Sequence, residues 1–229
     1  SNDLIDLLLA VDAIKYTYPQ AHLKELIIPY LPYARQDKRD GLGVSFSLKV
    51  VTQILDNIGF HLITCYDVHS SVAAACFNKT NFYSKAPTLA IIEWMHNVGI
   101  GNKSITIISP DQGAVKRASA VADATSSYLA SFNKIRDPRT GKVTKCELAG
   151  TLPTTLRYLV VDDICDGGAT FIEVAQKLQL PKEQMFLFTT HGIYSKGFDE
   201  LRKHYSIIGS TDSYSEIPET DFYKRIKII

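Results

Sequence analysis

An apolar run that ends in carboxylates and then glycines most constrains the fold of this chain. Residues 158–161 are apolar throughout, as in a strand buried on both faces of a parallel sheet. Three carboxylates and a Gly-Gly pair follow, and a helical apolar period then starts at Phe171. This strand–turn–helix unit predicts a parallel sheet that is covered by helices.

The same alternation recurs along the chain and predicts an α/β fold with helices on both faces of parallel sheets. A proline-containing stretch at 84–87 predicts two domains, 1–87 and 88–229. Further strands are expected at 25–29, 61–66, 105–108, 127–132, 185–189, 206–209 and 226–229, and at Leu148. Helices are expected at 4–16, 45–58, 88–98, 112–122, 171–178 and 197–205.

Composition excludes several classes of protein. A hydrophobic content of 45% supports a packed core, and the net charge of +1 argues against non-specific nucleic-acid binding. No apolar run approaches the roughly 18 residues of a membrane span, and Asp6 and Asp12 interrupt the run at 4–14. The four cysteines have no CxxC spacing, which indicates reduced thiols in a cytoplasmic protein without structural zinc.

Five polar clusters follow predicted strands, at 30–40, 67–70, 109–113, 162–170 and 189–192. Ligands of α/β sheets bind beyond the carboxyl ends of the strands, so these clusters predict a shared active-site face.

The cluster that follows residue 161 suits a phosphorylated sugar. Asp162, Asp163 and Asp166 would repel a bare phosphate, but they suit sugar hydroxyls or a metal that accompanies a phosphate. Gly167–Gly168 allows close backbone approach, and Thr170 lies near a helix start that favours an anion.

The residues alone leave simpler alternatives open. Arg35 and Gln36 fit a solvated loop equally well, and Asp111 fits the N-cap of the helix that follows it. A structural role is the commoner fate of a histidine such as His69, and it is the favoured role for His191. Three carboxylates before a Gly-Gly turn are harder to explain by turn chemistry.

Six segments together resemble ribose-phosphate diphosphokinase, also called phosphoribosyl pyrophosphate synthetase. The resemblance covers nearly the whole chain, whereas a phosphoribosyltransferase would show only a version of 160–170. Segments 45–50 and 166–168 most resemble the short forms of some bacteriophages. The six segments are PYARQDKRD (32–40), DVHS (67–70), SPDQGAVKRA (109–118), NKIR (133–136), VVDDICDGGAT (160–170) and THGIYS (190–195).

The resemblance implies two phosphoribosyltransferase-like domains with the active site between them. It implies transfer of the diphosphoryl group of ATP to the 1-hydroxyl of ribose 5-phosphate, with Mg²⁺ as cofactor and phosphoribosyl pyrophosphate and AMP as products. It also implies a cytoplasmic homo-oligomer, a dimer or higher, without nucleic-acid or membrane partners.

The resemblance assigns a role to each site residue. Arg35, Gln36 and Asp40 would bind ATP, and His69 and Asp111 would lie around Mg²⁺, although histidine is an unusual magnesium ligand. The expected catalytic residues are Lys134, Arg136 and His69, with 137–142 as a lid. The residues expected to bind ribose 5-phosphate are Asp162, Asp163, Asp166, Gly167, Gly168, Ala169 and Thr170.

Without the resemblance, residues 133–142 would be interpreted as a solvated surface hairpin. The chain also departs from the family, which usually has threonine where Gly167 stands and glycines where Ala114 and Ala169 stand. Ile135 occupies a position where a charged residue is common. The chain begins inside the family's first domain, so an incomplete nucleotide site is expected. Two alternatives therefore stay open: a non-catalytic binding subunit of the same fold, and a phosphoribosyltransferase.

Overall fold

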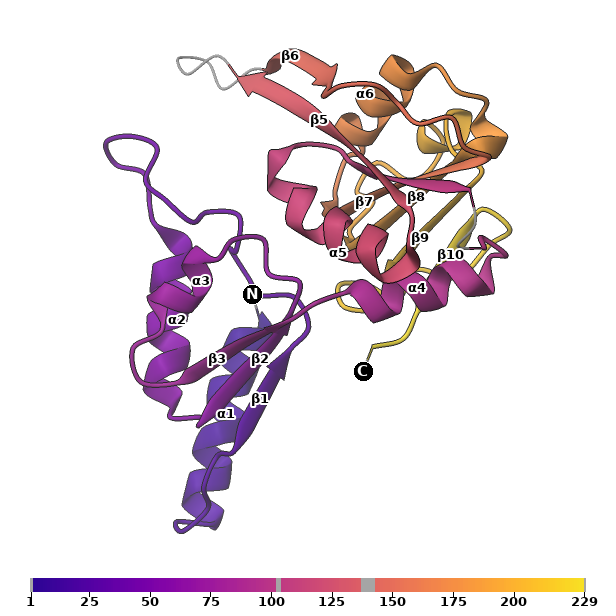
Figure 1. Cartoon of the computed structure of the whole chain (residues 1–229). Helices are drawn as coiled ribbons and strands as arrows, with labels where there is room; N and C mark the ends of the chain where they lie inside the picture. The colour runs from indigo at the N-terminus through magenta and orange to yellow at the C-terminus, as the bar shows by residue number, and fades with distance from the viewer. Residues whose placement is uncertain (1, 102–103, 137–142, 229) are drawn as a thin grey trace. The chain divides into compact units, whose positions relative to one another are not determined.

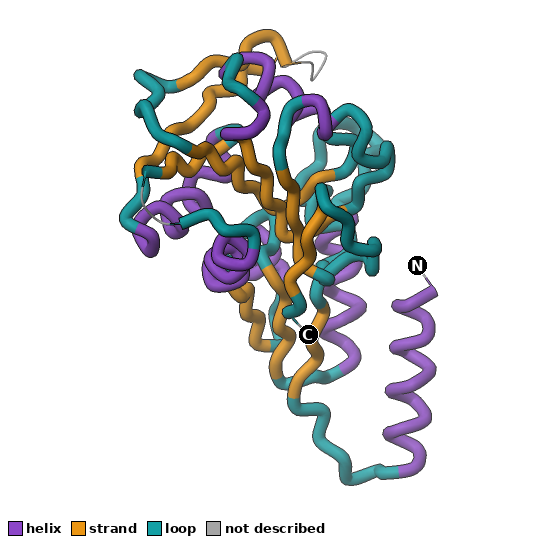
Figure 2. Tube along the Cα trace, turned by 90° about the vertical axis from the view of Figure 1, so that its right-hand side faces the viewer, coloured by secondary structure: helices purple, strands orange, loops and turns teal. Residues whose placement is uncertain are grey.

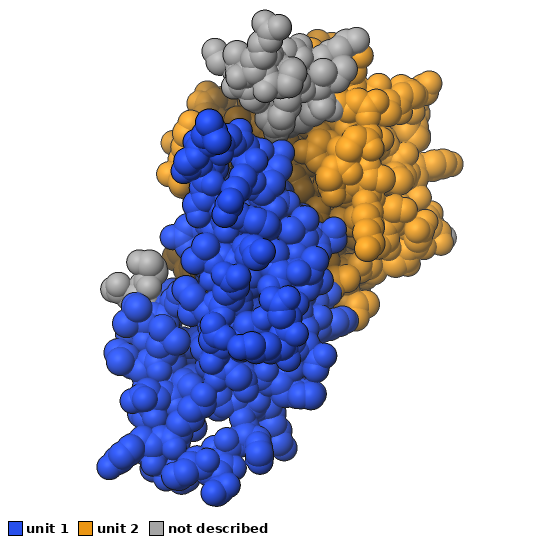
Figure 3. Space-filling view, turned by 90° about the vertical axis from the view of Figure 1, so that its left-hand side faces the viewer, with its two compact units in different colours: residues 1–85 blue, residues 86–229 orange. Residues whose placement is uncertain are grey.

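The computed structural model describes residues 2–101, 104–136 and 143–228, with only the backbone described at 2, 134–136 and 143–146. The chain divides into two compact units, Ser1–Lys85 and Ala86–Ile229 (Figure 3). The division falls close to the expected boundary between residues 87 and 88. Both units are α/β structures with parallel strands, which confirms the predicted fold class.

Unit 1 contains a three-stranded parallel sheet in the order β1–β2–β3 (Figure 1). Its core joins Leu48, Val51 and Leu55 of α2 to Ile63 and Cys65 of β2. Figure 2 shows α1 as the long helix that starts at the N-terminus. The elements are α1 (Asn2–Thr17), β1 (Glu25–Ile28), α2 (Ser47–Ile58), β2 (Leu62–Tyr66), α3 (Val72–Cys76) and β3 (Asn81–Lys85).

Unit 2 contains a seven-stranded sheet in the order β10–β9–β8–β7–β4–β5–β6. All neighbouring strands are parallel except β5 and β6, which form an antiparallel ribbon. The strands are β4 (Ile105–Ser109), β5 (Tyr128–Arg136), β6 (Val143–Leu148), β7 (Arg157–Cys165), β8 (Met185–Gly192), β9 (Ile207–Thr211) and β10 (Tyr223–Ile226).

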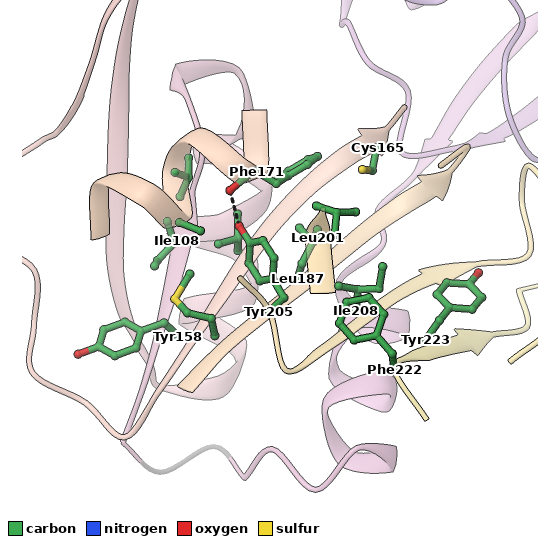
Figure 4. Packing of buried hydrophobic residues seen from close by; sticks show 14 of the residues in the cluster. Ile108, Tyr158, Cys165, Phe171, Leu187, Leu201, Tyr205, Ile208, Phe222 and Tyr223 are labelled. Carbon is green, nitrogen blue, oxygen red and sulfur yellow. Dashed lines mark hydrogen bonds between the residues drawn. The ribbon is translucent and has the colours of Figure 1, made fainter. Parts of the chain in front are cut away.

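The side chains of this sheet alternate between its two faces, and each face packs into a separate hydrophobic core. Leu159 and Val161 pack with α4 (Thr88–Asn97) and α5 (Val115–Thr125). Tyr158 and Val160 pack on the other face with α6 (Ala169–Leu178). Figure 4 shows part of this second core, where the Tyr205 hydroxyl donates to the Phe171 carbonyl over 2.7 Å. Burial on both faces explains why 158–161 is apolar throughout.

Three expectations about elements were wrong or incomplete. The expected helix at 197–205 is only a 3₁₀ turn, Leu201–Lys203, because Gly197 has a φ of +69° and the chain turns there to bury Leu201 and Tyr205. β6 runs antiparallel to β5, whereas the alternation of strands and helices predicted parallel sheets. α3 and β3 were not predicted, because β3 is largely exposed and lacks an apolar run. No described helix is long and apolar enough to cross a membrane.

Candidate functional site

The carboxyl edge of the unit 2 sheet brings together two of the predicted clusters. Strands β4 and β7 pair in parallel, with Ile108 opposite Val160, so the residues after Ser109 and after Val161 emerge at the same edge. Asp162 lies opposite Thr189 of β8. The charge of Asp111, which follows β4, contributes to the pKa shift of Asp162. Within unit 2, the sequence therefore identified residues that share one edge.

Arg117 of α5 joins the two buried carboxylates of β7. Its Nη1 atom lies 3.2 Å from Oδ1 of Asp162, and its Nη2 atom lies 4.0 Å from Oδ1 of Asp163. The three side chains are only 9%, 14% and 6% exposed, respectively. Sequence analysis gave Arg117 no role. Its signal is a cation on the helical stripe that also carries the buried residues Ala114, Ala118 and Val121.

The surroundings of Asp162 disfavour the charged form of its carboxyl group. Burial raises its pKa, the neighbouring charges of Asp163 and Asp111 raise it further, and Arg117 lowers it; the net pKa lies well above its ordinary value. The backbone N–H of Asp163 also donates to Oδ1 of Asp162 over 2.8 Å. A sugar hydroxyl or a cation that binds here would relieve this accumulation of negative charge.

Asp111 serves as the N-cap that the sequence left open as an alternative. Its Oδ1 atom accepts hydrogen bonds from the N–H groups of Gly113 (3.0 Å) and Ala114 (3.2 Å). Capping orients this carboxylate toward the start of the turn that leads into α5. In the described part of the chain, no group of three or more His, Cys, Asp or Glu side chains is arranged to hold a metal ion.

The loop after β7 leads directly into α6. Gly168 has a φ of +78° and stands at the N-cap position, where no side chain caps the helix. Ala169 and Thr170 form the first turn, so the N-terminal N–H groups of α6 face the loop without a capping side chain. Asp166 is exposed and Gly167 is half-buried. Backbone donors at a helix start suit a phosphate.

Lys134 and Arg136 lie on β5. The backbone of β5 pairs with β6 from Phe132 opposite Leu148 to Arg136 opposite Val143, with an irregularity between Ile135 and Arg136. The ladder extends the strand expected at 127–132, because the backbone pairing continues past Phe132. The expected lid, 137–142, lies outside the described residues.

In unit 1, the three residues expected to bind ATP share a surface pocket of about 360 Å³. Arg35 and Gln36 lie in a turn in which Tyr33 has a φ of +59°, and the N–H of Leu48 donates to the Gln36 carbonyl over 3.3 Å. Lys38 forms an exposed ion pair of 3.2 Å with Asp40. The pocket is lined by Arg35, Gln36, Asp37, Lys38, Asp40, Val44 and Ser45.

His69 is exposed and follows β2. It belongs to unit 1, whereas Asp111 belongs to unit 2, so the metal pair that was expected draws on both units. A larger pocket of about 610 Å³ lies at the opposite edge of the unit 1 sheet, before the strands begin. None of the expected site residues lines this larger pocket, which separates it from the chemistry inferred above.

Comparison with known proteins identifies relatives across the whole chain. The family model for the N-terminal domain of ribose phosphate pyrophosphokinase matches residues 1–59. A ribose-phosphate pyrophosphokinase of Mycoplasmopsis pulmonis is 28% identical over 237 residues, covering 100% of this chain and 70% of that protein. One of Granulibacter bethesdensis is 31% identical over 202 residues, covering 86% of this chain and 62% of that protein.

A solved structure supports the same fold. Phosphoribosylpyrophosphate synthetase from Mycobacterium smegmatis matches with a TM-score of 0.79 and 22% identity, covering 98% of this chain and 73% of that chain. The chain thus spans 62–70% of the length of the two curated relatives described above. Together with the motifs along both units, these matches show that the chain is similar to ribose-phosphate pyrophosphokinases, with the N-terminal domain model matching residues 1–59.

Proposed function

We propose that the protein is a ribose-phosphate diphosphokinase. In this reaction the 1-hydroxyl oxygen of ribose 5-phosphate forms a bond to the β-phosphorus of ATP. The bond from that phosphorus to the oxygen bridging the α- and β-phosphates breaks, AMP leaves, and the hydroxyl proton is released. The observation that carries the proposal is the buried Asp162–Asp163–Arg117 group directly before the uncapped start of α6.

The sugar phosphate would bind along the loop after β7. Asp162 and Asp163 would accept hydrogen bonds from the ribose hydroxyls. A neutral hydroxyl group suits these carboxylates better than an anionic group of the ligand would. The loop between the carboxylates and the helix start, formed by Asp166, Gly167 and Gly168, would line the ligand. The N–H groups of the first turn, together with the Thr170 hydroxyl, would hold the 5-phosphate.

ATP would bind at the pocket of unit 1. Arg35 carries a planar guanidinium that can donate two parallel hydrogen bonds to phosphate oxygens. Gln36 and Asp40 line the same pocket and can bond to the remaining polar groups of the nucleotide. The exposure of Arg35 and Gln36 leaves both side chains accessible to a ligand.

Charge on the transferring diphosphoryl group would be neutralised by cations. Lys134 and Arg136 are the protein cations in this proposal, and His69 is the remaining catalytic residue. Hard carboxylate oxygens fit Mg²⁺, and a cation would offset the burial and the neighbouring negative charges of Asp163 and Asp111 that raise the pKa of Asp162. Bound Mg²⁺ would neutralise phosphate charge, with Asp111 and His69 beside it.

The proposal includes a cytoplasmic location and a homo-oligomeric state. The buried free thiols Cys65, Cys76 and Cys165 suit a reducing compartment, which supports a cytoplasmic location. A homo-oligomer, a dimer or higher, is proposed from the family resemblance.

One assay tests the proposed reaction. The protein is incubated with ATP, Mg²⁺ and ribose 5-phosphate, and AMP and phosphoribosyl pyrophosphate are measured. We expect AMP to form only when ribose 5-phosphate is present. Folded protein that binds ribose 5-phosphate without producing AMP would be a binding subunit, and protein that instead consumes phosphoribosyl pyrophosphate with a nucleobase would be a transferase.

Lys134→Ala tests the catalytic assignment. Removal of a cation that acts mainly in the transition state is expected to lower kcat by about 10²–10³-fold with little change in the Kd for ribose 5-phosphate. Lys145→Ala is the matched control, because Lys145 lies on β6, opposite Ile135, and has no assigned role. An equal loss of turnover and of sugar-phosphate binding in Lys134→Ala would remove Lys134 from the catalytic residues.

A further inference from the structure

Lys196 lies directly over the glycine of the sugar-phosphate loop. A Cβ atom placed on Gly167 would lie 3.3 Å from Cε of Lys196, 3.4 Å from Cδ and 3.8 Å from Cγ. The aliphatic part of the lysine therefore packs against position 167, where a Cβ atom would require it to shift by only a few tenths of an ångström. The ammonium, one bond beyond Cε, is carried to the edge of the loop that precedes α6.

The segment that carries Lys196 is fixed to the end of β7. The N–H groups of Ile193 and Tyr194 both donate to the carbonyl of Cys165, over 2.9 and 3.0 Å. The N–H of Gly197 donates to the Tyr194 carbonyl over 2.8 Å, which closes a turn around Lys196. The Tyr194 ring is buried and packs edge-on against Phe198. These bonds fix the backbone that carries Lys196 beside the end of β7.

Within the described residues, the ammonium group of Lys196 has no ion-pair or hydrogen-bond partner. Its side chain is exposed. By contrast, Lys203 nearby in sequence is paired with Glu200 over 2.7 Å. An exposed ammonium one bond beyond a carbon that packs on Gly167, close to the loop before the uncapped start of α6, is a suitable partner for a phosphate dianion.

We propose that Lys196 binds the 5-phosphate of ribose 5-phosphate and that glycine at position 167 leaves Lys196 room that a branched side chain there would take. The inference deepens the function proposed above and rests on it. In this arrangement the ammonium supplies the side-chain donor that the loop lacks at position 167. Backbone N–H groups at the start of α6 bind the other phosphate oxygens.

Lys196→Ala is the first test, with the Kd for ribose 5-phosphate measured calorimetrically in the absence of ATP. Loss of a hydrogen bond between charged groups is expected to raise this Kd by about 10- to 100-fold. The KM for ATP and the free energy of unfolding should not change, and Lys196→Arg should retain most of the affinity. Lys203→Ala is the matched control and should bind normally.

A double-mutant cycle separates phosphate binding from simple packing. Gly167→Thr alone should weaken binding, because its branched side chain, which is larger than a lone Cβ, would push the aliphatic part of Lys196 aside. In the Lys196→Ala background the same threonine should not weaken binding further, and its hydroxyl should recover part of the lost affinity. Equal effects of Gly167→Thr in both backgrounds, or unchanged affinity in Lys196→Ala, would overturn the role of Lys196. Wild-type protein that fails to bind ribose 5-phosphate would instead overturn the proposed function as well.

Discussion

Asp162 is held between a cation and two other carboxylates. Arg117 reaches both Asp162 and Asp163, but one guanidinium cannot neutralise two buried carboxylates together with the field of Asp111. Burial of a charge without full compensation is costly, and the protein responds by retaining a proton more readily on Asp162. The cost is consistent with a site whose ligand completes its hydrogen bonds.

The raised pKa makes a prediction about stability and pH. Because the folded pKa of Asp162 lies above its ordinary value of 3.8, the folded state binds this proton more tightly than the unfolded state does. The associated stability is present below pH 3.8 and is lost as the pH rises through the folded pKa. Relative to Asp162→Asn, wild-type unfolding free energy should therefore fall over that window, by at most about 1.4 kcal/mol per pH unit.

Urea denaturation of the two proteins across this pH range measures the difference. Trp94, the single tryptophan of the chain, is buried in unit 2 and reports its unfolding by fluorescence. Asp166→Asn is the control, since Asp166 is an exposed carboxylate on the same loop. Parallel stability curves for wild type and Asp162→Asn would show that the carboxyl group at position 162 titrates alike in both states.

Sequence predicted the residues of this site better than their partners. The carboxylates after Val161 could be assigned to a strand end because an apolar run marks the strand. Arg117 lies 45 residues before Asp162 in the chain, and their ion pair depends on how α5 packs across β7, which local pattern does not encode. Lys196 was missed for the same reason, because its position depends on a turn fixed to Cys165.

At the level of elements, periodicity located the buried parts of the fold. Residues 158–161 of β7 and 185–188 of β8 are apolar throughout because both faces of their sheet are covered. The pattern was insufficient at the periphery, where β3 is mostly exposed and β6 lies at an edge. Segment 197–205 carries a helical pattern of apolar residues, but these residues reach the core through a 3₁₀ turn after a left-handed glycine.

The packing of α4 on the unit 2 sheet depends on one glycine of β9. A Cβ atom on Gly209 would lie 2.1 Å from Nε1 and 2.3 Å from Cε2 of Trp94. The indole is fully buried, and its N–H donates to the Lys224 carbonyl of β10 over 3.2 Å. Gly209→Ala must move the indole, so we expect it to lower the free energy of unfolding by about 1–3 kcal/mol.

Urea denaturation and the emission maximum of Trp94 measure this effect together. The displaced indole should lose its hydrogen bond to Lys224 and change its emission in the folded protein. Gly101→Ala is the control, because nothing lies within 4 Å of a Cβ at that position and its φ is not positive. If both alanine variants unfold at the same urea concentration, close packing of Trp94 on β9 does not limit stability.

At the scale of the whole molecule, the two units carry different parts of the proposed chemistry. Unit 1 holds the pocket with Arg35, whereas unit 2 holds the buried carboxylates and the start of α6. Each unit has its own sheet and its own core. A substitution in one unit should therefore weaken the binding of one substrate more than that of the other. Experiments can then distinguish the ATP site from the ribose 5-phosphate site.

Arg35→Ala tests this separation. Loss of a guanidinium that forks onto phosphate oxygens should raise the KM for ATP by about 10-fold or more, while the Kd for ribose 5-phosphate, measured without ATP, should stay at the wild-type value. Arg39→Ala is a close control, because Arg39 is an exposed arginine four positions away that does not line the pocket. Both variants retain the fold-determining residues of unit 1, so unfolding curves should match wild type. If Arg35→Ala raises the Kd for ribose 5-phosphate together with the KM for ATP, the two units do not bind their substrates independently. If Arg35→Ala and Arg39→Ala raise the KM for ATP equally, ATP is attracted by general positive charge rather than by a defined contact with Arg35.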